Sequence, residues 1–220
     1  MRLEYEKMDI NVLIQTLERA NDCNHAPIRC EMLLAKLNFF KTEFNNKNVL
    51  VAGSGLGDDS FKLAKFNKIV LGLEIVPQLL SISKNLKISQ EVDNVLFTNT
   101  DFVETKLPDK DFDVSVLNMG TMCNFNDTYK MRVISEMLRV SDILYFSFYL
   151  PDENSLRSRA SMYREEWLQE SKIEDVTISN HSGLRSASIS KQRVEELVSM
   201  CGYKVDFYSI NSFTCMAKVY

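Results

Sequence analysis

Short apolar runs alternate with amphipathic segments along most of this chain, and no other feature constrains its fold as strongly. The runs are typical of buried strands, and the segments between them have helical spacing. Because helices join consecutive parallel strands, the alternation predicts an α/β fold: a Rossmann-like, doubly wound sheet, mostly parallel, with helices on both faces. Seven strands are predicted, at 48–53, 68–75, 94–100, 112–118, 142–150, 204–210 and 213–220.

The same periodicity predicts the helices, at 9–43, 60–66, 77–89, 128–140 and 191–201. Only Asn211 and Ser212 separate the last two strands, which predicts a C-terminal hairpin and one antiparallel strand in the sheet. A chain of 220 residues is most simply one domain, here 1–220. Within it we expect N-terminal helices (1–45), a ligand-binding core (46–150), an insert (151–190) and a closing helix with the hairpin (191–220).

Charge and hydropathy narrow the classes of partner. The formal net charge is −4, which argues against nucleic acid because phosphate binding depends on clustered Lys and Arg. The longest apolar run, 143–150, is too short to cross a bilayer, and the N-terminus lacks the apolar core of a signal peptide. We therefore expect a cytoplasmic protein without a membrane partner, and a homodimer stays open as an alternative to a monomer.

The five cysteines are scattered and form no C-x-x-C pair. This spacing is typical of reduced, mostly buried thiols in a cytosolic protein. A zinc site would need neighbouring Cys or His ligands, and the two histidines are His25 and His181. We therefore expect neither a disulfide nor a metal site.

The stretch "NVLVAGSGLGDDS" places three glycines directly after the first predicted strand. A phosphate-binding P-loop is excluded because the chain has no Gly-Lys pair. The dinucleotide fingerprint would need glycine where the chain has Asp58, and Asp58 and Asp59 would repel a pyrophosphate. The loop therefore favours a ligand that has a positive centre and no phosphate.

Glu74 ends the second predicted strand, 21 residues after Gly53. A carboxylate at this spacing suits the two hydroxyls of a ribose. A ribose, a positive centre and no phosphate together describe S-adenosylmethionine.

Four segments resemble the class I S-adenosylmethionine-dependent methyltransferases, and they occur in the order of that family. They are "VAGSGLG", "GLEI", "NTDF" and "FDVSVLNMGTMCNF". The resemblance covers roughly residues 45–150 and, by topology, the C-terminal hairpin. It departs from the family at Ala52, where an acidic residue commonly helps to hold the ammonium of the cofactor, and Asp58 or Asp59 could substitute.

The resemblance implies a cofactor-binding set. The glycines would pass beneath the methionine part and the ribose, and Glu74 would bind the ribose hydroxyls. Ile75 would pack on the adenine, Asp101 would bind its amino group, and Asn118 would face the sulfonium. The complete set is Gly53, Ser54, Gly55, Gly57, Asp58, Glu74, Ile75, Asp101, Phe102, Asn118 and Met119.

Residues 151–190 are the least periodic part of the chain. Helical spacing puts Tyr163 and Trp167 on one face, which either packs on the domain or forms a lid that binds the acceptor. Arg185 is a candidate to bind a substrate carboxylate. His181 is a candidate general base, and Tyr149 is a second candidate catalytic residue.

The end of the fourth strand lacks the Asn/Asp-Pro-Pro-aromatic motif of enzymes that methylate bases and glutamine. We therefore expect a small-molecule acceptor with an amine, carboxylate or hydroxyl that is methylated by in-line displacement. Two alternatives stay open. One is a different reaction of the same sulfonium that releases methylthioadenosine, and the other is a non-catalytic binding subunit.

Overall fold

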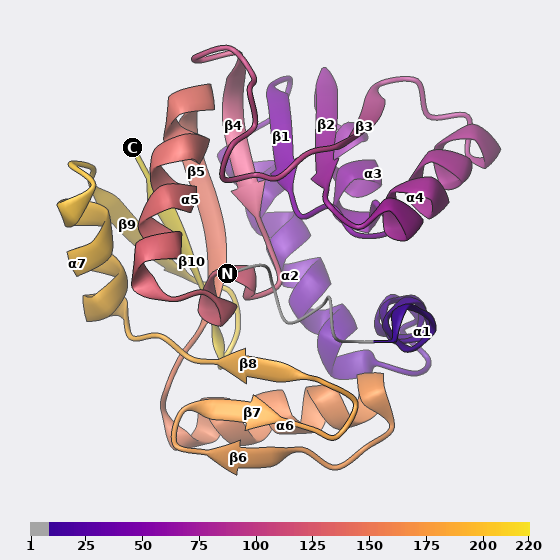
Figure 1. Ribbon diagram of the computed structural model, residues 1–220, viewed down its shortest axis with the longest axis vertical. Coiled ribbons are helices and arrows are strands. Elements are labelled where there is room, and N and C mark those ends of the chain that lie inside the picture. Colours follow the sequence, from indigo (N-terminus) through magenta and orange to yellow (C-terminus); the bar gives the residue numbers. More distant parts are fainter. Residues whose placement is uncertain (1–8) are drawn as a thin grey trace.

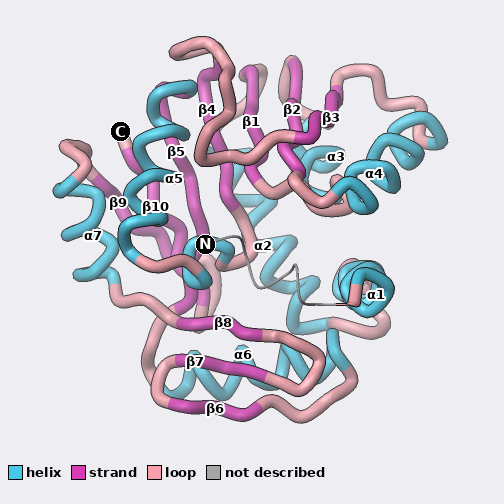
Figure 2. Tube along the Cα trace, in the orientation of Figure 1, coloured by secondary structure: helices cyan, strands magenta, loops and turns pink. Residues whose placement is uncertain are grey.

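The computed structural model describes residues 9–220, and residues 1–8 of the expected N-terminal segment lie outside them. Its main sheet has seven strands in the order β3-β2-β1-β4-β5-β10-β9 (Figures 1 and 2). β10 runs antiparallel to both of its neighbours, and the strands from β3 to β5 pair in parallel. This confirms the predicted Rossmann-like topology. The strands are β1 (Asn48–Ala52), β2 (Ile69–Glu74), β3 (Val95–Asn99), β4 (Phe112–Leu117), β5 (Ser141–Tyr149), β9 (Val205–Ser209) and β10 (Thr214–Val219).

Apolar side chains of the sheet alternate between two cores, one on each face. In β1, Val49 and Val51 belong to one core, whereas Leu50 and Ala52 belong to the other. A strand that is apolar on both sides must be covered on both sides, and here helices cover both faces of the sheet. The first core is covered by α2 (Pro27–Glu43), α3 (Asp58–Ala64) and α4 (Pro77–Ser89), and the second by α5 (Asp127–Val140) and α7 (Lys191–Met200).

The predicted helix 9–43 is two helices, α1 (Ile10–Ala20) and α2. The chain turns between them, and Pro27 begins α2 because a proline fits the first helical turn. α1 packs through Leu13 on Leu56 and Leu79. Figure 1 shows α1 beyond the carboxyl ends of β1 and β2, so it lies where a ligand of the sheet would bind.

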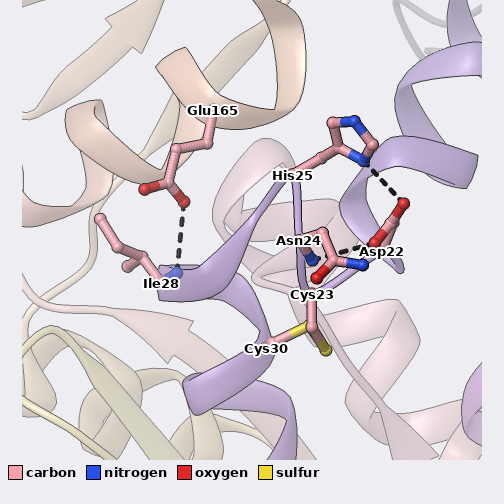
Figure 3. Close-up of a disulfide and its surroundings, with 7 residues drawn as sticks. All are labelled: Asp22, Cys23, Asn24, His25, Ile28, Cys30 and Glu165. Carbon is pink, nitrogen blue, oxygen red and sulfur yellow. Dashed lines mark hydrogen bonds and ion pairs between the residues drawn. A yellow bond between two sulfur atoms is a disulfide. The ribbon is translucent and has the colours of Figure 1, made fainter.

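A disulfide joins Cys23, in the turn after α1, to Cys30 in the first turns of α2 (Figure 3). The expectation of five reduced thiols is therefore wrong. The reason is the tight turn between the helices, which folds the chain back and brings two cysteines of no recognisable motif together. The other cysteines are free thiols, at Cys123, Cys201 and Cys215.

The insert after β5 forms a small unit of its own. α6 (Glu153–Trp167) packs on a three-stranded antiparallel sheet of β6 (Lys172–Glu174), β7 (Thr177–Ser179) and β8 (Arg185–Ala187). Arg159 is fully buried and donates to the carbonyls of Ser186 and Ala187, each at 3.2 Å. Figure 1 shows this unit across the carboxyl ends of the central strands.

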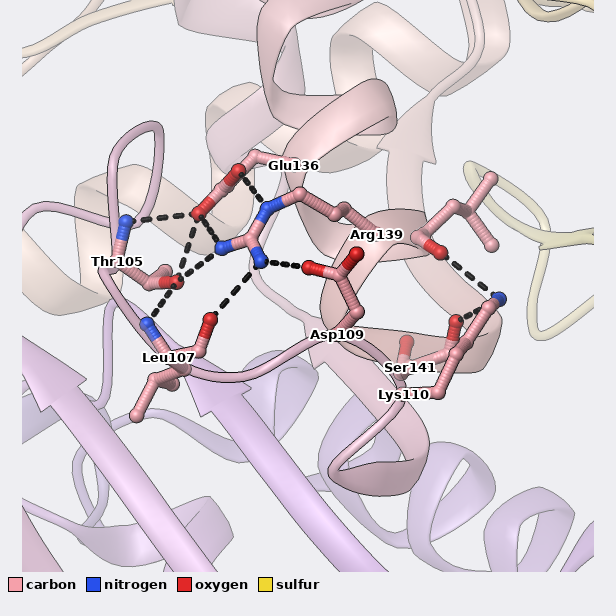
Figure 4. Close-up of polar contacts among 8 residues, drawn as sticks. Thr105, Leu107, Asp109, Lys110, Glu136, Arg139 and Ser141 are labelled. Carbon is pink, nitrogen blue, oxygen red and sulfur yellow. Dashed lines mark hydrogen bonds and ion pairs between the residues drawn. The ribbon is translucent and has the colours of Figure 1, made fainter.

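Polar contacts with α5 hold the long loop between β3 and β4 (Figure 4). Glu136 accepts hydrogen bonds from the backbone N–H and the hydroxyl of Thr105, at 2.8 and 2.7 Å, and Arg139 donates to the carbonyl of Leu107 at 2.9 Å. Arg139 also pairs with Glu136 and Asp109. These contacts fix the loop that carries two of the predicted cofactor-binding residues.

Among residues 9–220, no helix is long and apolar enough to span a bilayer.

Candidate active site

A cavity of about 750 Å³ is lined by residues at the carboxyl ends of β1 to β4, by α1 and by the α6 unit. This volume suits a small-molecule ligand. The predicted site residues that line it are Gly53, Ser54, Gly55, Asp58, Glu74, Ile75, Asp101, Phe102, Asn118, Met119, Tyr149, Tyr163, Trp167 and Arg185. The cavity therefore joins strand ends that are far apart in the sequence to the insert.

The glycine loop turns sharply between β1 and α3. Gly53, Gly55 and Gly57 all have positive φ, at 69°, 55° and 95°, a region that disfavours other residues. Gly57 does not line the cavity but has a packing role, because a Cβ there would lie 2.8 Å from the rings of Phe61 and Phe97. The loop thus brings bare backbone to the wall of the cavity.

Glu74 joins the end of β2 to this loop. Its two carboxylate oxygens accept from the backbone N–H groups of Gly55 and Val76, each at 2.8 Å. Burial raises the pKa of Glu74 above its usual value, and these hydrogen bonds oppose the shift. Each oxygen keeps a second lone pair, so the carboxylate can still accept from two hydroxyl groups of a ligand.

Asp101 and Phe102 follow β3 in the loop that α5 anchors. The Oδ1 atom of Asp101 accepts from the N–H of Val103 at 3.0 Å, and Asp101 lines the cavity. Phe102 is buried beneath the glycine loop and packs on Phe125, with 5.9 Å between the ring centroids. Phe102 thereby forms an apolar floor beside an acidic group.

A buried polar cluster lies where β4 ends. The Oδ2 atom of Asp59 accepts from Asn118 Nδ2 at 2.7 Å and from Lys36 Nζ at 3.2 Å. Burial opposes the charge of Asp59, but Lys36 and Asn118 outweigh it and lower the pKa of Asp59 below its usual value. The same burial lowers the pKa of Lys36, which is only 2% exposed. The cluster therefore supplies a fixed carboxylate, paired with Lys36, whereas Ala52 supplies no polar side chain.

The turn after β4 depends on a close contact with Tyr149. Met119 and Gly120 both have positive φ, at 64° and 65°, and a Cβ at Gly120 would overlap the ring of Tyr149. The hydroxyl of Tyr149 donates to the carbonyl of Met119 at 3.2 Å. Burial raises the pKa of Tyr149 well above its usual value, so this group is a hydrogen-bond donor at neutral pH and not a base.

Two aromatic rings and a buried ion pair form the far end of the cavity. Tyr149 and Tyr163 meet edge to face, with 6.5 Å between their centroids. Arg29 Nη1 donates to Glu166 Oε1 at 2.8 Å, and both side chains are at least nine-tenths buried. This end combines apolar ring faces with groups of both charges.

Sequence reasoning missed Lys36, Arg29 and Glu166. The sequence did contain one indication of Arg29 and Lys36. Both are cationic residues in a mostly apolar helix, at positions that share one helical face. Nothing local indicated Glu166, because its partner lies 137 residues away.

The structure does not bring His181 to the cavity. His181 is exposed in the turn between β7 and β8, where Asn180 closes the turn by accepting from the N–H groups of Ser182 and Leu184. His181 is exposed at this turn and is not among the residues that line the cavity. Arg185 lies at the cavity but is itself exposed.

A family model described as "Methyltransferase domain" matches residues 43–198, and no curated protein matches the chain. Solved structures match more widely. The PH0226 protein from Pyrococcus horikoshii has a TM-score of 0.67 at 19% identity, over 90% of this chain and 95% of its own. DhpI, in a complex with SAM and HEP, has a TM-score of 0.63 at 17% identity, over 96% and 97%.

Magnesium protoporphyrin IX methyltransferase from Synechocystis PCC 6803, with bound SAH, has a TM-score of 0.59 at 14% identity, over 88% of this chain and 82% of its own. At such identities, the likeness to solved structures concerns the fold alone.

Proposed function

The chain belongs to the methyltransferase domain family, and we propose that it transfers the methyl group of S-adenosylmethionine to a small-molecule acceptor. One observation carries the proposal. A single cavity holds the glycine loop, the carboxylates of Glu74 and Asp101 and the end of β4, and it continues into an aromatic compartment with room for a second molecule.

The residues present fit this cofactor. Next to the glycine loop, the cavity wall leaves Ser54 Oγ and Asn118 Oδ1 buried without a hydrogen-bond partner, and a polar ligand would satisfy both. Glu74 would hold the ribose hydroxyls and Asp101 the adenine amino group, while Ile75 would cover the adenine ring. When bound, the cofactor supplies an electrophilic methyl group on a positive sulfur.

The chain contributes mainly position to the reaction. An in-line displacement needs the attacking atom and the methyl carbon held in line, and orientation alone lowers such a barrier substantially. The carbonyl of Met119, fixed by Tyr149, and the rings of Tyr149 and Tyr163 would orient the acceptor. No general base is assigned, because Tyr149 stays protonated and His181 lies outside the cavity.

The acceptor would be a small molecule with an amine, carboxylate or hydroxyl. The same cavity of about 750 Å³ must hold both ligands, which limits the size of the acceptor. Trp167 and Arg185 would contact it from α6 and β8. The Synechocystis enzyme acts on magnesium protoporphyrin IX, as its name states, and thus also on a small molecule. The cytoplasmic location, the biosynthetic role and the homodimer remain hypotheses from the sequence.

The nucleoside product tests the proposal. The purified protein is incubated with S-adenosylmethionine, with and without a metabolite extract, and both nucleosides are quantified by mass spectrometry. Methyl transfer predicts S-adenosylhomocysteine that depends on the extract. Methylthioadenosine as the main product would instead support cleavage or aminocarboxypropyl transfer.

A further inference from the structure

We infer that Arg29, Asp59 and Asn118 form a receptor for an α-amino-acid group, with the methionine part of S-adenosylmethionine as its ligand. The inference rests on the proposed function for the identity of the ligand. The family commonly has an acidic residue at the position of Ala52, at the end of β1, that helps to hold the ammonium of the cofactor. In this chain, the three side chains would bind the amino-acid group instead.

Arg29 lines the cavity and has an edge without hydrogen-bond partners. Its Nη1 atom donates to Glu166 at 2.8 Å, but its Nε atom is buried without a partner, and within residues 9–220 no hydrogen bond is made by Nη2. Nε and Nη2 form the side-on edge of the guanidinium, whose two parallel N–H groups match the two oxygens of a carboxylate. Arg29 lines the cavity and is only 9% exposed. The edge therefore fits a bidentate carboxylate ligand.

Asp59 and Asn118 present two acceptors in the same cavity. Both partners of Asp59 use its Oδ2 atom, and across the described part of the chain Oδ1 accepts no hydrogen bond. Asn118 Nδ2 donates to Asp59, while its Oδ1 is buried without a partner. An ammonium group has three donors and no acceptor, so it can donate to both oxygens, which an apolar ligand end cannot do.

α2 sets the spacing between Arg29, which would bind the carboxylate, and the pair of Asp59 and Asn118, which would bind the ammonium. Arg29, Leu33 and Lys36 are at positions i, i+4 and i+7, so they lie on one helical face, about 10 Å from first to last along the axis. Lys36 contacts Asp59, and the charge of Arg29 affects the pKa of Lys36. Lys36 is thus a positioning residue that fixes Asp59 within reach of the group that Arg29 binds.

The charge of the cavity wall suits a cationic cofactor. Its charged side chains are three arginines and six carboxylates, which leaves a formal charge of −3. They are Arg29, Arg132, Arg185, Asp58, Asp59, Glu74, Asp101, Glu104 and Glu166. S-Adenosylmethionine carries one net positive charge, from its ammonium, sulfonium and carboxylate groups. An amino-acid acceptor would present the same ammonium and carboxylate, so the test must separate the two sources.

Binding of two nucleosides distinguishes the amino-acid group of the cofactor from that of an acceptor. S-Adenosylhomocysteine and methylthioadenosine share adenine, ribose and sulfur, and only the first carries the amino-acid group. Both are titrated by calorimetry into the wild type, into Asn118→Ala and into the double variant Arg29→Met/Glu166→Gln, which leaves no buried charge unpaired. Glu166→Gln alone is the matched control, because it keeps the side-on edge of Arg29.

We expect Asn118→Ala and the double variant to weaken S-adenosylhomocysteine binding about tenfold or more and to leave methylthioadenosine binding nearly unchanged. Retained methylthioadenosine binding also reports that each variant is folded. Glu166→Gln should keep the wild-type ratio of the two affinities. Equal losses for both nucleosides, or no loss for either, would overturn the receptor and leave the proposed function standing. A wild type that binds neither nucleoside would instead overturn the proposed function.

Discussion

Glu74 couples the cofactor site to the fold, because its carboxylate holds the backbone of Gly55 on one side and of Val76 on the other. The same oxygens would accept the ribose hydroxyls. One side chain would thus both shape the glycine loop and bind the ligand. The spacing of the sequence places it at the end of β2, and the structure has it there.

Glu74→Ala should weaken S-adenosylhomocysteine binding by about 1–3 kcal/mol, the usual cost of losing hydrogen bonds to a charged group. Calorimetry measures the change, and Glu195→Ala, at an exposed position of α7, is the control. Because Glu74 also holds the loop, the melting temperature of each variant is recorded. An unchanged affinity would contradict the ribose assignment.

Whether a residue that lines the cavity could be predicted from the sequence depends on how it comes to lie there. Glu74, Asp101 and Asn118 were predicted to lie together because each is at or just beyond the end of a strand, and strand ends of a parallel sheet meet at one edge. All three line the cavity. Arg29 and Glu166 acquire their role only when α2 and α6 pack together, from positions 137 residues apart. His181 was proposed from its chemistry alone, and its place in an exposed turn could not be predicted from the sequence.

At the scale of elements, the helix pair α1 and α2 is the least expected part of the site. α1 contributes Leu13, Thr16 and Leu17 to the cavity wall. Asn21, in the turn after it, donates to Asp58 at 2.5 Å, and the Cys23–Cys30 disulfide ties the same turn to α2. The disulfide therefore holds the wall of the cavity that α1 provides.

Removing the disulfide with Cys23→Ser/Cys30→Ser should loosen α1 and leave the sheet intact. A crosslink across so short a segment is worth about 2.5 kcal/mol when the whole chain unfolds. Hydrogen exchange should therefore rise in 10–26 and stay unchanged in β1, β4 and β5. Cys201→Ser, at a free thiol, is the control. Equal exchange in both variants would show that the disulfide does not hold α1.

The loop between β3 and β4 depends on Glu136. Its pKa is lowered to about 2 from 4.5, chiefly by Arg139 and against the effect of burial, with Thr105 assisting. A carboxylate with a depressed folded-state pKa contributes stability above its unfolded pKa, and this contribution is lost as the pH falls through the folded value. The window is therefore about pH 4.5 down to about 2.

Glu136→Gln should lower the free energy of unfolding at pH 7, and its deficit relative to the wild type should shrink as the pH falls through that window. Urea denaturation at pH 7 and at pH 3 measures both values. Glu195→Gln is the control, because its side chain is exposed on α7. A deficit that is independent of pH would mean that the carboxylate charge of Glu136 does not stabilise the loop.

Element boundaries were predicted with unequal success. The helix at 77–89 was predicted to the residue, because Pro77 marks its start. The strands β6, β7 and β8 were missed because each has only three residues, too few to show an alternating pattern. Their identity as strands depends on pairing with one another and on the hydrogen bonds from Arg159.

At the scale of the whole molecule, the sheet supplies one half of the cavity and two units outside it supply the rest. α1 and the α6 unit both lie across the carboxyl ends of the strands (Figure 1). The alternation of strands and helices predicts the first half, whereas the second half forms from segments without a strong pattern. We expect acceptor specificity to depend on that second half, because one fold can host enzymes that act on many different acceptors.

Trp167 offers a reporter for the assembled cavity, because it is the single tryptophan of the chain and lines the cavity from the end of α6. Ligand binding should change its fluorescence with a saturable dependence on concentration. Titration with S-adenosylhomocysteine measures the change, and Trp167→Phe should abolish it. A calorimetric binding signal without any change in fluorescence would place Trp167 away from the bound ligand.

The central claim is that this cavity moves a methyl group to a small molecule, and the most direct measurement follows the methyl group itself. The protein is incubated with a metabolite extract and S-adenosylmethionine that carries a trideuterated methyl group, and metabolite masses are compared with a sample that lacks protein. If the cavity transfers a methyl group to a small molecule, one acceptor gains a trideuteromethyl group, and Glu74→Ala slows the gain. Consumption of the cofactor without a labelled metabolite would contradict methyl transfer to a small molecule.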